Sequence, residues 1–298
     1  MTVSSGILVM NKPQGFTSFD VIGKLRGILK MKRLGHTGTL DPMATGVLPV
    51  LIGTAARACD ILPDERKSYR ACFQLGTVTD TQDSSGNVLE THPFDVSEDA
   101  LRSVLPQFTG EIRQIPPMYS AVQIGGKRLY ELAREGKEIE RPARTVTVSG
   151  LRLEAYDPVS GSGTLAIDCG KGTYVRTILH DIGSVLGCGC MMTALERTAA
   201  CGFTLSDAHT FAEVQQAADE DTLDSLIIPT DRLFLPLPAV TLNETQTRLY
   251  RNGVLLALSR LRELPEGTRF RIYSAEQRFL GLANADREQN CLRVYKNL

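Results

Sequence analysis

Residues 35–46 read GHTGTLDPMATG, and this stretch is the best guide to the fold. Its three glycines and one proline interrupt both helical and alternating apolar patterns, so we expect a loop. One carboxylate, Asp41, stands in the loop, and the apolar residues on both sides of it would hold the loop against a core. A rigid, poorly solvated loop can present such a carboxylate to a substrate as a nucleophile or a base.

Two other interpretations of Asp41 stay open on the evidence of its neighbours. Because Asp-Pro commonly starts a turn, Asp41 could simply cap one. The glycines could also form a phosphate-binding loop, but the spacings GxxxxGK[ST] and GxGxxG do not occur here. On its own, the loop therefore favours the interpretation of Asp41 as a turn cap. The segments around the loop have to decide between this and a catalytic role.

The residues around the loop predict a helix before it and strands after it. Apolar residues recur at helical spacing from Ser18 to Leu29, with Ser18 placed as the N-cap and a basic end formed by Lys30, Lys32 and Arg33. Residues 47–52 are an apolar run typical of a buried strand, and residues 69–75 alternate like a strand with one polar face. Further helices are expected near residues 97–105, 127–135 and 177–186, and further strands near residues 144–155, 164–169, 269–273 and 291–295.

This mixture predicts an α+β fold with a mixed or antiparallel sheet rather than repeated βαβ units. Three prolines between residues 229 and 238 follow an acidic stretch and precede a change of composition, which indicates a domain boundary. We therefore expect a larger domain over residues 1–230 and a small β-rich domain over residues 231–298.

Four segments in order connect the chain to a known family. Residues 35–46 closely resemble the catalytic motif of the TruB family of tRNA pseudouridine synthases. Residues 11–18 (NKPQGFTS) resemble its N-terminal motif, residues 67–70 (KSYR) its tyrosine motif, and residues 172–176 (GTYVR) its arginine motif. Four independent motifs in the family's order are not explained by chance. The resemblance implies the catalytic fold of pseudouridine synthases followed by a small PUA-like domain.

The resemblance also implies an activity, the isomerisation of a T-loop uridine of tRNA, position 55, to pseudouridine. This reaction breaks a C–N bond, turns the base and forms a C–C bond to the same sugar. It needs a closed pocket and one anionic group, and we expect neither a cofactor nor a metal. Asp41 would supply that group, either by attack on uracil C6, by attack on ribose C1′, or by first removing a sugar proton.

Two further residues would complete the catalytic set by the same resemblance. Tyr69 would lie against the uracil and take the C5 proton, although a phenol with a pKa of about 10 is a weak base. Its alternation with Arg70 suits a core aromatic equally well. Arg176 would pair with Asp41 and keep it ionised, since an unpaired buried carboxylate tends to neutralise.

The remaining site residues are expected to contact the RNA or shape the pocket. Tyr174 would share a face with Arg176 if the local chain is extended, and Leu195 would form an apolar wall. The target uridine must leave its stack, and His36 is placed to fill the vacated space or to stack on a loop base. Lys12 would contact phosphate or support the floor of the pocket.

The expected partner is the T-arm stem-loop of tRNA, bound by a monomer. Residues 123–144 carry six Lys/Arg residues around Tyr130 and Leu132, and they resemble the mobile thumb with which the family closes over RNA. Four interspersed glutamates leave the segment only slightly basic, so a solvated helix with i,i+4 ion pairs is the alternative.

The net charge of −1 conceals charged blocks. Residues 1–76 and 232–298 are each net +5, whereas residues 77–110 are net −5 and residues 205–231 are net −7. Segregation of this kind can build a basic face on a neutral protein, as phosphate recognition requires.

Seven cysteines with no CxxC pair suggest neither a disulfide framework nor a zinc ribbon, and a reducing cytoplasm fits them. Cys188 and Cys190 could be half of a metal site, but no partner ligands stand at suitable spacing. The stretch from Met1 to Asn11 does not read as a secretory signal, and no apolar run is long enough for a membrane span.

A binding function is the main alternative to catalysis. A chaperone that clamps and refolds the tRNA elbow would need the basic surfaces but not the Asp41 carboxylate. The two functions can coexist, and substitution of Asp41 separates them.

Overall fold

The computed structural model describes residues 5–261 and 264–298. Residues 1–4, which belong to the N-terminal stretch considered above, lie outside the described residues. The centre of the fold is a nine-stranded sheet whose main path runs β1-β3-β12-β4-β11-β10-β7, with β2 paired to β3 and β13 to β12. These strands are β1 (Ser5–Lys12), β2 (Leu34–His36), β3 (Thr45–Gly53), β4 (Lys67–Leu75), β7 (Gly110–Gln114), β10 (Arg144–Asp157), β11 (Ser162–Cys169), β12 (Cys190–Ala200) and β13 (Phe203–Thr204).

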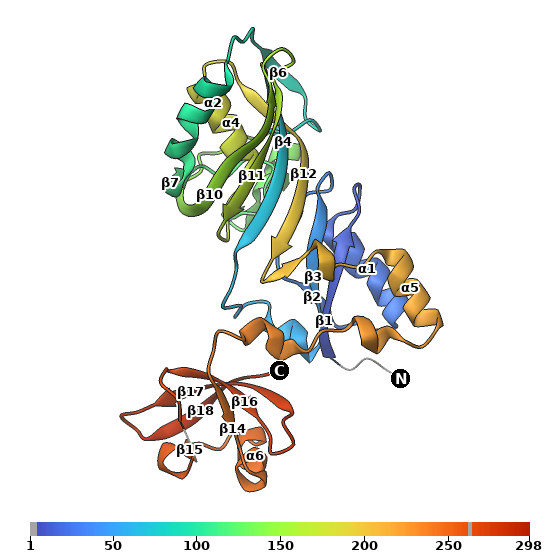
Figure 1. Ribbon diagram of the computed structural model, residues 1–298, viewed down its shortest axis with the longest axis vertical. Helices are drawn as coiled ribbons and strands as arrows, with labels where there is room; N and C mark the ends of the chain where they lie inside the picture. Colours follow the sequence, from blue (N-terminus) through green and yellow to red (C-terminus); the bar gives the residue numbers. More distant parts are fainter. Residues whose placement is uncertain (1–4, 262–263) are drawn as a thin grey trace.

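The sheet is mixed, as expected. Its neighbouring strands pair antiparallel, except for β3 and β12, which pair in parallel at Thr45 and Gly46 opposite Glu196 and Arg197. This short parallel contact joins the N-terminal part of the sheet to the larger part that carries β4, β10 and β11. Figure 1 shows the two parts one above the other, with β4 and β12 as long curved strands between them.

Helices cover the sheet in two places (Figure 1). Helices α1 (Ser18–Leu29) and α5 (Phe211–Asp219) lie together beside β1 and β3. Helices α2 (Glu98–Val104) and α4 (Val175–Val185) cover the part formed by β4, β7, β10, β11 and β12. Two small hairpins complete this region, β5 (Thr77–Thr79) with β6 (Val88–Thr91), and β8 (Gln123–Ile124) with β9 (Lys127–Arg128), the latter followed by α3 (Leu129–Arg134).

Helix α1 has the predicted bounds but a different cap. Thr17 is the N-cap, and it forms a capping box in which its side chain accepts from the Asp20 amide while the Asp20 carboxylate accepts from the Thr17 amide. The prediction that Ser18 caps the helix was therefore wrong. Ser18 is the first helical residue and is buried, and its hydroxyl bonds to the backbone of Leu40 instead.

Most of the other predicted elements are present, with shifted ends. The predicted helices near residues 97–105 and 177–186 correspond to α2 and α4, and the predicted strands correspond to parts of β3, β4, β10, β11, β16 and β18. Near residues 127–135 only 129–134 are helical, because the first two residues belong to β9. The predicted loop is shorter than expected, since residues 35 and 36 belong to β2 and residues 45 and 46 to β3.

The C-terminal region is a five-stranded sheet with the order β14-β16-β17-β18-β15. Its elements are β14 (Ala239–Thr241), α6 (Glu244–Arg251), β15 (Leu256–Ala257), β16 (Arg269–Tyr273), β17 (Phe279–Asp286) and β18 (Cys291–Asn297). Together with the large sheet it makes the predicted α+β fold with a small β-rich C-terminal part. Figure 1 shows this part below the large sheet.

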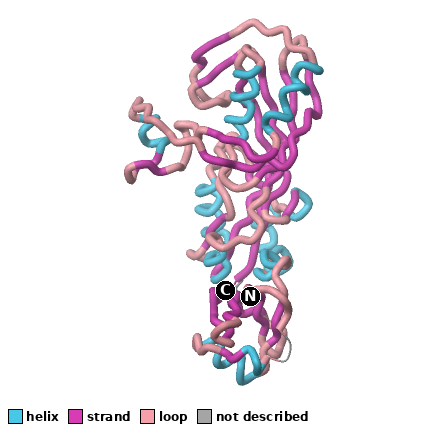
Figure 2. Tube along the Cα trace, turned by 90° about the vertical axis from the view of Figure 1, so that its left-hand side faces the viewer, coloured by secondary structure: helices cyan, strands magenta, loops and turns pink. Residues whose placement is uncertain are grey.

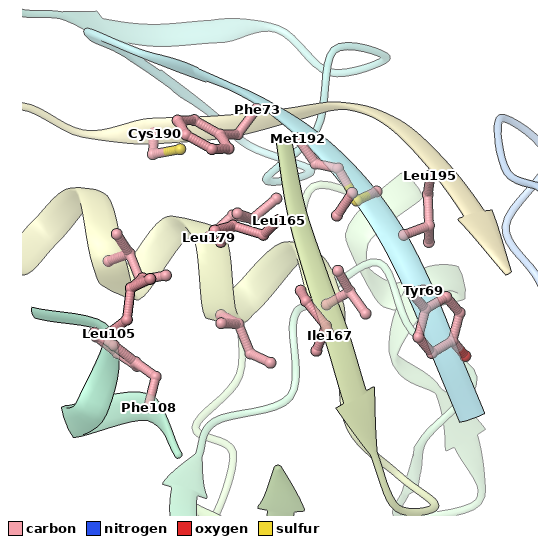
Figure 3. Packing of buried hydrophobic residues seen from close by; sticks show 14 of the residues in the cluster. Tyr69, Phe73, Leu105, Phe108, Leu165, Ile167, Leu179, Cys190, Met192 and Leu195 are labelled. Atoms are coloured by element: carbon pink, nitrogen blue, oxygen red, sulfur yellow. The ribbon is translucent and has the colours of Figure 1, made fainter. Parts of the chain in front are cut away.

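One apolar cluster lies between the large sheet and the helices α2 and α4. Figure 3 shows side chains of β4, β11 and β12 pointing from the sheet toward α4, with Tyr69 and Leu195 at one end of the cluster. The alternation predicted for β4 is confirmed, because Tyr69, Ala71 and Phe73 are buried while Arg70 is exposed.

All seven cysteines lie among the described residues and are free thiols. In residues 5–261 and 264–298 no group of His, Cys, Asp or Glu residues is arranged to hold a metal ion. The same ranges contain no helix that is both long and apolar enough to span a membrane.

Candidate active site

The Asp41 loop is held from beneath by the segment that joins β1 to α1. The Ser18 hydroxyl accepts from the Leu40 amide at 2.8 Å and donates to the Leu40 carbonyl at 3.2 Å. The amide of Gly15 donates to the Pro42 carbonyl at 2.8 Å. Residues on both sides of Asp41 are thus fixed to the same neighbouring segment, so the loop presents its carboxylate from a rigid support.

Lys12 is part of this support. Its side chain is fully buried, and its ammonium group donates to the carbonyls of Pro13 at 3.0 Å, Phe16 at 2.6 Å and Pro42 at 3.3 Å. These three acceptors use all the donors of an ammonium group. Burial lowers the pKa of Lys12 to about 8. Of the two roles expected for Lys12, this enclosed position suits support of the pocket floor, and a contact with phosphate stays a prediction.

Arg176 meets Asp41 across 135 residues of sequence. Its Nη2 lies 3.1 Å from Asp41 Oδ1 and 3.0 Å from Asp41 Oδ2, so the expected pairing is present. The arginine side chain is 6% exposed and the aspartate side chain 34% exposed, which leaves one side of the carboxylate open to a substrate.

Arg176 reaches Asp41 from the first turn of α4 rather than from an extended segment. Tyr174 stands at the N-cap position of that helix and Arg176 is its second residue. The chain is helical from Val175 onward, so the condition of an extended local chain, under which Tyr174 and Arg176 would share a face, does not hold. Tyr174 is fixed through its backbone, which exchanges two hydrogen bonds with the Gln114 side chain, and the residue is half-buried.

The second partner of Arg176 is Asp83, which sequence reasoning missed. Arg176 Nη1 lies 3.6 Å from Asp83 Oδ2, and the Asp83 side chain is only 3% exposed. The other Asp83 oxygen accepts from the Thr81 hydroxyl and the Ser85 amide. Asp83 lies in the turn-rich segment 80–87, which follows β5. A cluster of acidic and hydroxyl residues there was the available signal.

The protein shifts the acidity of Asp41 in two directions. Burial is the largest influence and raises the pKa of Asp41 above its ordinary value, while the neighbouring Arg176 lowers it. The nearby Asp83 carboxylate raises it further, and Lys12 lowers it. The arginine acts in the expected direction, but burial outweighs it, so Asp41 takes up a proton more readily than an exposed aspartate.

Tyr69 and Leu195 belong to the same apolar cluster as Leu40 of the Asp41 loop. They stand on the neighbouring strands β4 and β12, and both are buried. Figure 3 shows them on the same side of the sheet, with the Tyr69 hydroxyl at the end of the apolar cluster. Burial raises the pKa of Tyr69 to about 12. The phenol is thus a weaker acid here than in water, which favours its neutral form.

His36 ends β2, four residues from Leu40 along the loop. Its Nδ1 accepts from the Gly38 amide at 3.3 Å, which orients the ring. Burial and the charge of Arg197 lower the pKa of His36. A neutral imidazole at the edge of the loop can stack on a base without repelling the cations around it.

Arg197 is the second residue that sequence reasoning missed. It lies on β12, is fully buried, and donates from Nε to the Val47 carbonyl at 2.7 Å and from Nη2 to the Gly38 carbonyl at 3.2 Å. These bonds fasten the start and the end of the segment that carries Asp41. A lone arginine within the apolar run of residues 190–200 was the signal that we passed over.

The segment expected to act as a thumb is a hairpin and a helix that stand away from the body of the protein (Figure 2). Arg128 and Arg134 lie over the ring of Tyr130, at 5.9 and 5.4 Å from its centre. Lys127 and Lys137 both pair with Glu135. Much of the basic charge is therefore balanced within the segment, although these two pairs do not have the i,i+4 spacing of the alternative.

Comparison with known proteins agrees with this geometry. Residues 26–175 match the model of the N-terminal domain of TruB family pseudouridylate synthases, residues 176–235 match the tRNA pseudouridylate synthase B C-terminal domain, and residues 238–292 match a pseudouridine synthase II TruB C-terminal model. The chain is 41% identical to the tRNA pseudouridine synthase B of Lachnoclostridium phytofermentans, over 98% of this chain and 99% of that relative. It is 42% identical to the tRNA pseudouridine synthase B of Geobacillus kaustophilus, over 85% of this chain and 91% of that relative.

Solved structures share the same fold. A Cbf5-Nop10-Gar1 complex contains a chain that superimposes with a TM-score of 0.72 at 26% identity, covering 94% of this chain and 78% of that one. A structure of the archaeal box H/ACA sRNP Nop10-Cbf5 complex gives a TM-score of 0.73 at 23% identity, covering 99% of this chain and 86% of that one. The family models, the curated relatives and the fold agree, and the chain belongs to the TruB family of pseudouridylate synthases.

Proposed function

We propose that this enzyme converts a uridine in the T loop of tRNA, position 55, to pseudouridine, with Asp41 as its catalytic carboxylate. The observation that carries the proposal is the pair formed by Asp41 and Arg176, which come from a loop and a helix far apart in sequence. The names of the curated relatives support tRNA as the substrate.

The surroundings of Asp41 suit a reaction that proceeds without a cofactor. One open side of the carboxylate would face the nucleotide, while Arg176 holds its other side at about 3 Å. The uracil would lie between Tyr69 and Leu195, whose buried side chains exclude water from the detached or covalently held base. Tyr69 would accept the C5 proton after the new C–C bond has formed.

Access to a stacked uridine requires that it leave the loop of the folded tRNA. Turning a nucleotide out of its stack costs a few kcal/mol, which contacts with the enzyme must offset. His36, with a ring oriented by Gly38 and a lowered pKa, is placed to stack in the vacated space. Tyr174 would complete the pocket on the side of α4.

We assign the catalytic domain to residues 1–230 and the small RNA-binding domain to residues 231–298, with residues 123–144 as the thumb. The projecting hairpin and helix would move against the T arm as a unit (Figure 2). The enzyme would act as a monomer, because one chain carries Asp41, Arg176 and Tyr69 together.

The decisive experiment is release of tritium from tRNA labelled at C5 of its uridines, with no cofactor added. Asp41→Asn keeps the size of the side chain but removes the charge, and we expect the rate to fall by roughly 10²-fold to 10⁴-fold or more. Asp99→Asn, which changes an exposed carboxylate in the first turn of α2, is the matched control and should react at the normal rate.

Full activity of folded Asp41→Asn would refute the proposed role of Asp41. If the wild-type protein released no tritium but still promoted tRNA folding, the chaperone function would replace the enzymatic one. Sequencing the product for pseudouridine tests the position in the tRNA separately from the chemistry.

A further inference from the structure

Arg197 and Tyr69 are directly opposite each other on the antiparallel strands β12 and β4. Directly opposite residues in such a pair point to the same face of the sheet, with their Cβ atoms about 5 Å apart. Arg197 is completely buried and Tyr69 is 8% exposed. The guanidinium and the phenol therefore share one enclosed space at the end of the apolar cluster.

The Arg197 side chain is fixed, yet one of its donors is unused. Nε and Nη2 are taken by the Val47 and Gly38 carbonyls. Nη1 is buried and has no hydrogen-bond partner among the residues that the structure describes. A buried donor without a partner is costly, and more so when it carries charge, so an unused guanidinium nitrogen points to a ligand or to a reactive state that completes it.

The charged and titratable groups around the Tyr69 phenol act in opposite senses. Asp41 on the loop and Cys169 at the end of β11 both raise the pKa of Tyr69 by their negative charge when ionised. The positive charge of Arg197 acts in the opposite direction and lowers the pKa of Tyr69. Arg197 is thus the group that favours an anionic Tyr69.

We propose that Arg197 is a positioning residue for Tyr69, in which the free Nη1–H group donates to the phenolate oxygen and holds it at the C5 atom of the rotated base. The inference rests on the proposed function, in which Tyr69 accepts the C5 proton. That proton passes to the phenolate oxygen, and the electrons of the C5–H bond form the C5=C6 double bond. The electron pair displaced from the former C6=N1 bond takes a proton from solvent at N1, and the phenol later returns its proton to solvent.

A purely structural role would have different consequences. If Arg197 only fastened Gly38 to Val47, its replacement would loosen the Asp41 loop but would not change the acidity of Tyr69. The test must therefore report on the Tyr69 oxygen itself rather than on turnover alone.

The acidity of Tyr69 can be measured by placing 3,5-difluorotyrosine at position 69 and following its ¹⁹F resonance against pH in the full-length protein. We expect Arg197→Gln, which keeps amide donors for the two carbonyls but loses the charge, to raise this pKa by about one pH unit or more. Arg197→Lys keeps a cation that cannot serve both carbonyls and the phenolate, so its shift should be smaller and in the same direction. Arg70→Gln, on the exposed face of β4, is the matched control and should leave the titration unchanged.

An unchanged titration in folded Arg197→Gln would overturn the proposal. If that variant does not fold, Arg197→Lys decides in the same way, because an unchanged pKa there also contradicts a bond between Nη1 and the phenolate.

A kinetic cycle gives a second readout. Tritium release is measured for Arg197→Gln, Tyr69→Phe and the double variant. We expect the double variant to be no slower than the slower single variant, because both substitutions remove the same interaction. If the rate losses of the two single variants multiplied in the double variant, the two residues would act independently and the proposal would be contradicted. Absence of tritium release from the wild-type protein would refute the proposed function, whereas the ¹⁹F titration would still report on the link between Arg197 and Tyr69.

Discussion

At the scale of single residues, the site is a row of three charges rather than a simple pair. Arg176 lies between Asp41 and Asp83, 3.0 Å from the first carboxylate and 3.6 Å from the second. Asp83 is almost fully buried and cannot reach the substrate in place of Asp41. Asp83 instead pairs with Nη1 of Arg176, while Nη2 pairs with Asp41, and it places a second negative charge on the opposite side of the guanidinium.

Replacement of Asp83 by asparagine should change both the rate and its dependence on pH. Arg176 would lose one of its two carboxylate partners, and a small displacement of Asp41 is expected to lower kcat by roughly 10-fold to 100-fold. In the proposed mechanism activity needs ionised Asp41, so the rate should fall as the pH drops through the pKa of Asp41. Asp83 raises that pKa, and its removal should therefore move the acidic fall in rate to lower pH. Single-turnover tritium release between pH 4 and 8 measures this shift.

Asp80→Asn is the control, because it removes a charge from the same turn without touching Arg176. A pH profile of Asp83→Asn that moves to higher pH, or one that moves equally in both variants, would contradict this role of Asp83.

The sequence reveals the proposed catalytic residues better than the residues that hold them. Asp41, Tyr69 and Arg176 stand in recognisable short motifs, so their proximity could be expected from the sequence alone. Asp83 and Arg197 stand in segments that read as a turn and an apolar run. Their importance arises from contacts with residues 93 and 150 positions away, which no local pattern contains.

At the scale of elements, the site depends on the parallel contact between β3 and β12. Gly46 on β3 has φ +101° and lies against the backbone of Arg197. A Cβ atom at this position would stand 2.2 Å from the Arg197 carbonyl oxygen. Only glycine permits both the backbone conformation and the close approach. The strand that carries Leu195 and Arg197 is in this way set directly beside the Asp41 loop.

Gly46→Ala should therefore destabilise the protein and disturb the site. We expect the free energy of unfolding to fall by about 2 kcal/mol or more, from backbone strain and from separation of the strands. Gly27→Ala is the matched control, because Gly27 lies in α1 with nothing within 4 Å of its added methyl group. That substitution should raise the free energy of unfolding by about 0.5–1 kcal/mol. Chemical denaturation measures the free energy of unfolding of both variants. Equal changes in the two variants would contradict the tight contact at Gly46.

The same contact explains why β12 could not be predicted from its residues. Its sequence, CMMTALERTAA, is rich in residues that favour helices, and we expected no strand there. Pairing with β3, β4 and β13 overrides that preference, because a strand inside the sheet satisfies its backbone on both sides. Strand β4 also lies inside the sheet, but its residues alternate between apolar and polar and so predict a strand, whereas the residues of β12 do not.

At the scale of the whole molecule, the charge distribution gives a neutral protein a surface suited to RNA. The basic block that precedes the catalytic loop includes Lys30, Lys32 and Arg33, which are exposed just after α1 and lead directly into β2 and His36. In the sequence the acidic blocks are separate from it, at residues 77–110 and 205–231, although α5 of the second block packs beside α1. A polyanion that approaches the segment between α1 and β2 would meet the positive charges of Lys30, Lys32 and Arg33.

This arrangement predicts how binding of tRNA responds to salt. Each phosphate contact releases counterions, so the logarithm of the binding constant falls linearly with the logarithm of the salt concentration. Replacing Lys30, Lys32 and Arg33 together by alanine should weaken binding and reduce the magnitude of that slope by about 2, the value for two or three lost phosphate contacts. Titrations of an unmodified T-arm stem-loop at several salt concentrations measure the slope, with inactive Asp41→Asn as the background.

The matched control replaces three exposed arginines in the larger part of the sheet and its helices. These are Arg102 on α2, Arg113 on β7 and Arg152 on β10. Both triple variants lose the same net charge, so a general loss of attraction would lower the slope equally in the two. A reduction confined to the first variant would locate the RNA backbone beside α1 and β2, because only direct contacts distinguish the two sets. Equal slopes in the parent protein and both triple variants would show that the RNA phosphates bind elsewhere. Lys30, Lys32 and Arg33 would then have no part in recognition of the RNA.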